Sequence, residues 1–254
     1  MNAERTLAIA GLWGAALTVV ILAMSVLLRL GTQIEAGEVV STLPSALEQG
    51  ARIAHRVAAM GVAALAALAL VAALRARPVP RRWAVACIAA LTLLLAIIGR
   101  YTPGYRLDLV TIVNVVAGTA LACAFWWLRA PGDAAPRHSD AVAWIALALL
   151  LALAALGAAA NAAAMRGERA FGPLHLWLAA IFTLLALTAA WRRRRRHGLA
   201  IAVATLAPLQ FGVGFLLVGV AGARPIALVW GHAMIACALA LLLVSLAAPI
   251  RGRP

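Results

Sequence analysis

Eight apolar stretches, each about as long as a membrane is thick, follow one another along the chain. A bilayer core is about 30 Å thick and a helix rises about 1.5 Å per residue, so a span needs about 20 apolar residues. Hydrophobic residues make up 65% of the 254, which leaves too few polar side chains for the surface of a soluble domain. We therefore predict an all-α, polytopic membrane protein. The predicted spans are Leu7–Leu28, Ala51–Leu74, Trp83–Ile98, Leu109–Leu128, Ala141–Ala163, Gly172–Trp191, Leu199–Val220 and Ile226–Ala247.

The basic residues favour one side of this eight-span arrangement. All 22 are arginines, and most fall in alternate loops. By the positive-inside rule that side faces the cytoplasm, together with both termini. The net charge of +14 then reflects topology and contact with anionic lipid, and no nucleic-acid partner is expected. The arginines on this side are Arg5, Arg75, Arg77, Arg81, Arg82, Arg129, Arg137, Arg192–Arg196, Arg251 and Arg253.

Three histidines lie near the outer ends of even-numbered spans. They are His55, His175 and His232, and Asn114 takes the corresponding place in the remaining even span. An ionisable side chain inside a membrane is costly, so its default interpretation is a functional site. A histidine that only hydrogen-bonds a neighbouring helix is the structural alternative.

The same positions indicate an internal repeat. His175 follows His55 by 120 positions, and His232 follows Asn114 by 118. Four spans return the chain to the same side, so the halves would be related by a pseudo-twofold axis along the membrane normal. We expect two four-helix bundles, formed by residues 1–130 and 141–254 and joined by a cytoplasmic linker at residues 131–140.

The spacing of the histidines favours haem as a cofactor. Two neutral imidazoles at one depth, on parallel helices of one bundle, suit axial ligation of a haem iron from both sides. His175 and His232 are expected to face each other in this way in the second bundle. A closed zinc site is disfavoured, because it needs four ligands and no cysteine or carboxylate stands beside these histidines.

Arginines at the outer edge could bind the haem propionates, since a guanidinium offers a carboxylate two parallel donors. Arg56, Arg166, Arg169 and Arg224 are the predicted propionate ligands. Some outer arginines are expected to pair instead with surface carboxylates, which are Glu35, Glu38, Glu48, Asp108 and Glu168.

Four further features lead to predictions. Trp126 and Trp127 are expected at the membrane interface. Gln210 is expected to form a hydrogen bond between helices, and Gly212, Gly214 and Gly219 to permit close approach of a helix or a flat ligand. The outer loop after the first span has about twenty residues. It is either a lid or docking surface, or a solvated acidic loop.

At these residues the chain resembles the haem A synthase family, eight-span cytochrome oxidase assembly proteins of bacteria and mitochondria. The resemblance rests on VLLRLGT, AHRVAAMG, IIGRYT, PLHLWLA and the C-terminal LQFGVGFLLVGVAGARPIALVWGHAMIACALALLL. It implies a haem b held by His175 and His232. It also implies a second haem in the first half, with His55 as its iron ligand and catalytic residue, where the methyl group of haem O is oxidised to the formyl group of haem A.

The resemblance further implies a bacterial inner (plasma) membrane, and names haem O synthase or oxidase assembly factors as candidate partners. The chain departs from the family at Asn114, where a second histidine is usual, and at Arg52, where a glutamate is usual. It also lacks the outer cysteine pair of many members. These departures leave open a non-enzymatic haem-binding or electron-transfer protein, and a transporter built from two parallel repeats is a third possibility.

Overall fold

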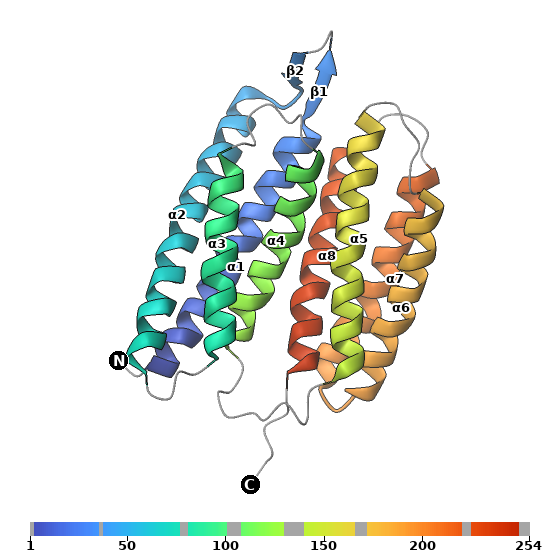
Figure 1. Cartoon of the computed structure of the whole chain (residues 1–254). Coiled ribbons are helices and arrows are strands. Elements are labelled where there is room, and N and C mark those ends of the chain that lie inside the picture. Colours follow the sequence, from blue (N-terminus) through green and yellow to red (C-terminus); the bar gives the residue numbers. More distant parts are fainter. Residues whose placement is uncertain are drawn as a thin grey trace.

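Eight helices, all long and apolar enough to cross a membrane, dominate the described chain (Figure 1). A computed structural model describes residues 3–35, 38–76, 81–100, 108–129, 140–165, 172–219 and 225–248. The prediction of an all-α membrane protein with eight spans is confirmed by the helix lengths and composition. The helices are α1 Ala3–Leu30, α2 Ser45–Arg75, α3 Arg82–Gly99, α4 Asp108–Trp127, α5 Ala141–Met165, α6 Gly172–Arg192, α7 His197–Gly219 and α8 Ile226–Ala247.

Large apolar side chains cover the outside of the helices. Trp177 is 74% exposed and Leu74 is 70% exposed, as contact with lipid requires. Between the helices the contacts are made by small side chains, and Ala10, Ala69 and Ala186 are completely buried. Lipid offers no hydrogen bonds to the backbone, so continuous helices with small residues at their contacts are the structure that this composition favours.

The second helix begins earlier than the sequence pattern indicates. It starts at Ser45 rather than Ala51, directly after Pro44, which has φ −54°. The fixed φ of proline suits the start of a helix, where its missing N–H leaves no hydrogen bond unmade. Hydropathy could not reveal this start, because the added residues are largely polar.

A short hairpin occupies the outer loop, where the sequence predicted no regular structure. Strands β1 (Thr32–Glu35) and β2 (Glu38–Ser41) pair antiparallel, with Thr32 opposite Ser41. At the base of the hairpin the amide of Thr42 donates to the carbonyl of Gly31 at 2.7 Å. Four-residue strands contain too few alternating residues to give a strand signal against a polar background.

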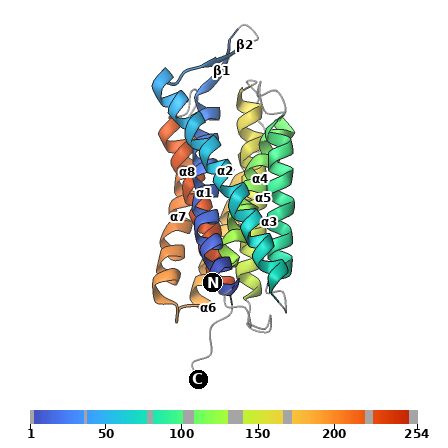
Figure 2. The same ribbon diagram turned by 90° about the vertical axis from the view of Figure 1, so that its left-hand side faces the viewer.

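Each half of the chain forms a closed set of helix contacts. In the first half α1 and α3 both pack against α2 and α4, and in the second half α5 and α7 both pack against α6 and α8 (Figures 1 and 2). The halves meet where α4 packs on α5 and α8, and where α1 packs on α8. The contacts between the halves follow the same repeat. In the repeat α4 corresponds to α8 and α1 to α5, so the contact of α4 with α5 corresponds to that of α8 with α1.

Tryptophans bond the two halves together near the ends of their helices. The indole Nε1 of Trp126 donates to Oγ of Ser245 at 2.7 Å, and that of Trp230 donates to the carbonyl of Ala23 at 3.0 Å. The ring of Trp127 lies 5.9 Å from that of Trp83 and 5.3 Å from that of Trp144. Trp126 and Trp127 are partly buried between helices, because each indole finds a partner there.

Arginines tie the loops to the helix ends at the end of the molecule where α1 begins and α8 ends, which we call the basic end (lower in Figure 1). The guanidinium of Arg81 donates to the carbonyl of Leu128, and that of Arg196 to the carbonyl of Ser245. The opposite end carries β1 and β2, and we call it the hairpin end. Arg81 and Arg196, which the sequence analysis places on the cytoplasmic side, therefore have hydrogen-bond partners within the protein.

Candidate functional site

The three histidines singled out from the sequence all lie in the half of their helices nearer the hairpin end. His55 is 20 residues before the last residue of α2, Arg75. His175 is 17 residues before Arg192 at the end of α6, and His232 is 15 before Ala247 at the end of α8. All three side chains are partly buried. These three helices run in the same direction, so the three histidines lie toward the same end of the molecule.

His175 and His232 both face the interior of the second half. The helices that carry them, α6 and α8, touch each other only slightly, and α5 and α7 pack on both of them. Among the described residues no group hydrogen-bonds Nδ1 of either ring, and both nitrogens are buried.

A glycine faces each of these two rings. A Cβ atom added to Gly214 of α7 would lie 3.1 Å from Cε1 of His232, and one added to Gly157 of α5 would lie 3.5 Å from Cε1 of His175. Side chains larger than glycine would therefore meet the rings. The close approach predicted at Gly214 is confirmed, whereas at Gly212 no atom of the described residues lies within 4 Å of an added Cβ, so the close approach of a helix predicted there is wrong. Gly157 gave no signal because a glycine in an Ala-rich helix does not stand out.

Gln210 completes a polar cluster inside the second half. It is 8% exposed, and its Nε2 lies 3.2 Å from Nε2 of His232, so the predicted hydrogen bond between helices is confirmed. Its Oε1 is buried and has no hydrogen-bond partner within the described ranges. A buried polar group left without a partner costs about 1–3 kcal/mol. Three such atoms in one place, on Gln210, His175 and His232, favour a bound group that satisfies them.

The first half gathers positive charge around its histidine. The charges of Arg29 and Arg56 act on His55, and Nη1 of Arg29 also donates to the carbonyl of Thr111 at 3.2 Å. Asn114 is partly buried one turn further along α4. Among the described residues, Arg29 and Arg56 lie on the helices around His55, whereas the polar side chain that contacts His232 is the uncharged Gln210.

Arg52 does not belong to the arginines around His55. Its side chain is 48% exposed and pairs with Glu48 one turn earlier in α2, at 2.6 Å from Nη2 to Oε1. The prediction that some outer arginines pair with surface carboxylates is confirmed here. An exposed pair of this kind contributes about 1 kcal/mol or less.

The predicted propionate ligands are described only in part. Arg56 is exposed on α2 at the hairpin end. Arg166, Arg169 and Arg224 lie outside the described residues, in the stretches that precede α6 and α8. No test of these three positions therefore comes from the structure.

Among the described residues, no three side chains of histidine, cysteine, aspartate or glutamate come together as a metal site. A closed zinc site needs four such ligands, whereas haem brings four nitrogens of its own and needs two axial residues. In the second half, His175 and His232 would supply the two side-chain ligands that haem needs.

No protein-family model matches the chain, and no curated protein matches its sequence. The chemistry of the site therefore rests on these side chains alone.

Proposed function

We propose that the chain is a haem A synthase-like membrane protein that binds a haem b between His175 and His232. One observation carries the proposal. Both imidazoles lie inside the second half, on α6 and α8, each has a buried nitrogen without a partner among the described residues, and each faces a glycine. Iron ligation would satisfy ring nitrogens, and the glycines leave room beside the rings.

The proposed architecture is a pair of four-helix bundles related by a pseudo-twofold axis along the membrane normal. Residues 1–130 and 141–254 would form the bundles, with residues 131–140 as a linker. The repeated helix contacts support this arrangement, since each contact within α1–α4 has a counterpart within α5–α8. The spacing of 120 residues from His55 to His175 supports it independently.

Gln210 would take part in haem binding through His232. It bonds Nε2 of that histidine, so ligation through Nδ1, the nitrogen without a partner, would keep this hydrogen bond, whereas ligation through Nε2 would require it to open. The freed amide could then donate to a propionate or to the other ring. When bound, haem would supply an iron that changes oxidation state, and Arg166, Arg169 and Arg224 would neutralise the propionates at the hairpin end.

The first half would bind a second haem at His55, with Arg56 as a propionate ligand. In the enzymatic form of the proposal, this haem is haem O and its methyl group is oxidised to the formyl group of haem A. Asn114 would leave one face of the iron free for oxygen. The cationic surroundings of His55 suit an anionic haem substrate.

A second candidate function is that of a haem-binding or electron-transfer protein without oxidative activity. The pairing of Arg52 with Glu48 favours it, because the position at which the resembled family has a glutamate carries an exposed arginine here. Asn114 also makes a weaker iron ligand than histidine. Both candidates share the haem b of the second half.

A haemochrome assay on the purified protein tests the shared claim. We expect b-type haem in the unmodified chain, and its loss in His175→Ala and in His232→Ala. His197→Ala is the matched control, because His197 is exposed at the basic end. Absence of haem, or its retention in both site variants, would refute the proposal.

Reconstitution with haem O separates the two candidates. Conversion to haem A supports the enzymatic form, and haem binding without conversion supports the second candidate. Colourless protein contradicts both and favours the transporter.

A further inference from the structure

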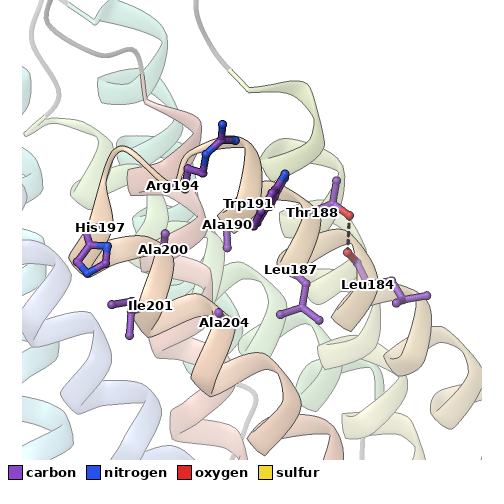
Figure 3. A pocket seen from close by; sticks show the side chains of 10 residues that line it. All are labelled: Leu184, Leu187, Thr188, Ala190, Trp191, Arg194, His197, Ala200, Ile201 and Ala204. Carbon is purple, nitrogen blue, oxygen red and sulfur yellow. Dashed lines mark hydrogen bonds between the residues drawn. The ribbon is translucent and has the colours of Figure 1, made fainter.

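An apolar groove of about 550 Å³ lies between α6 and α7 near the basic end (Figure 3). Alanines form its floor, and longer apolar side chains form its walls. Its volume falls within the range of about 300–1,000 Å³ that is usual for sites of small ligands. The groove lies at the edge of the molecule away from α1–α4 (Figure 1), where a spanning protein meets lipid. Its apolar lining includes Leu184, Leu187, Ala190, Ala200, Ile201 and Ala204.

One end of the groove is cationic and aromatic. The guanidinium carbon of Arg194 lies 5.1 Å from the centroid of the Trp191 ring, and His197 lines the groove across from them at the start of α7 (Figure 3). Trp191 is 70% exposed, as tryptophans at a membrane interface are. The groove therefore changes from apolar to cationic toward the loop between α6 and α7.

Three neighbouring arginines, Arg192, Arg193 and Arg196, have partners within the protein, whereas Arg195 is exposed. Arg192 and Arg193 both pair with Oδ2 of Asp140 at 3.3 Å, and Asp140 is only 4% exposed. Arg196 donates to the carbonyl of Ser245, and burial beside Arg193 lowers the pKa of Arg196.

Arg194 differs from them. It is exposed, and no carboxylate within the described part of the chain pairs with it. Stacking on Trp191 fixes its position at the mouth of the groove, while its N–H donors stay available to an anion.

We propose that this groove binds one anionic phospholipid, with its phosphate at Arg194 and an acyl chain along the alanine floor. Charge complementarity selects an anionic lipid, because the positive end of a zwitterionic headgroup would meet the same arginine. The alanines set the width of the groove, since α6 and α7 contact each other there with Ala190 and Ala200 buried and Ala204 exposed. The proposal is independent of the haem site, which lies toward the other end of the helices.

Native mass spectrometry of the full-length, delipidated chain tests this site, with phosphatidylglycerol titrated against phosphatidylcholine of the same acyl chains. We expect one phosphatidylglycerol to be retained in preference. Arg194→Gln should weaken this binding about fivefold, the share of one arginine near a charged membrane surface. Arg75→Gln is the matched control, since Arg75 is exposed at the end of α2 in the other half.

The apolar part of the groove has its own pair of variants. Ala204→Leu fills the floor and should reduce retention of phosphatidylglycerol, whereas Thr205→Leu places the same side chain at an exposed position of α7 that does not line the groove. Equal retention in all four variants, or equal retention of phosphatidylcholine, would overturn the proposal. Phosphatidylglycerol should raise the midpoint of thermal unfolding, whereas inorganic phosphate should not. An equal rise with inorganic phosphate would also overturn the proposal. If Ala204→Leu fails to fold, the comparison of Arg194→Gln with Arg75→Gln still tests the proposal.

Discussion

Gly214→Leu is the sharpest test of the site in the second half. A Cβ at this position already comes within 3.1 Å of Cε1 of His232, so the side chain of leucine must displace the ring. Adding bulk to a packed site costs about 1–3 kcal/mol. If this free energy is lost through displacement of the His232 ring, haem affinity should drop by about 5- to 150-fold, because 1.4 kcal/mol corresponds to about tenfold. We expect the purified variant to lose most of its haem in the haemochrome assay and to change its Soret band.

The matched control is Gly212→Leu, two residues earlier in the same helix. No atom lies within 4 Å of a Cβ built there, so leucine has room and the haem content should not change. Both variants replace glycine in α7, so their effects on helix propensity cancel. Full haem content with an unchanged spectrum in Gly214→Leu would refute the geometry that we propose, as would equal losses in the two variants.

Three further predictions concern stability and use the midpoint of thermal unfolding in detergent. Asp140→Ala should destabilise the protein more than Asp140→Asn, by about 1 kcal/mol, because Oδ1 of Asp140 accepts from the amide of Val142 at 3.0 Å and asparagine can keep this helix cap. Trp126→Phe should cost about 1 kcal/mol by removing the bond to Ser245, whereas Trp13→Phe on the exposed surface should not. Arg52→Gln should change the midpoint little, because its pair with Glu48 is exposed.

The helices could be predicted from the sequence because hydropathy alone determines where a chain can cross lipid. The prediction failed where other forces decide. Pro44 and the polar residues after it extend α2 beyond the apolar stretch. The hairpin of β1 and β2 is held by backbone pairing, and its residues alternate over too short a length to be distinguished from a loop.

The candidate site could be predicted in part for a related reason. Histidines inside apolar helices are conspicuous, so the sequence alone singles out His175 and His232. It does not single out Gly157, because the contact of this glycine with His175 depends on how α5 packs against α6. The partner of Trp126 could not be predicted for the same reason. A tryptophan at the end of a span suits the interface, and only the position of Ser245 on α8 shows that its N–H has a protein partner.

The difference between the two halves leads to a last prediction, for His55→Ala. In the second half two histidines face the interior beside glycines, whereas in the first half His55 lies among arginine charges and Asn114 stands in place of a partner. One axial histidine holds haem less firmly than two, so we expect His55→Ala to keep most of the b-type haem that His175→Ala and His232→Ala lose. Under the enzymatic proposal, His55→Ala should also abolish conversion of haem O while the haem b spectrum remains. Loss of all haem in His55→Ala would mean that the halves do not bind independently, and would contradict the assignment of the haem b to the second half alone.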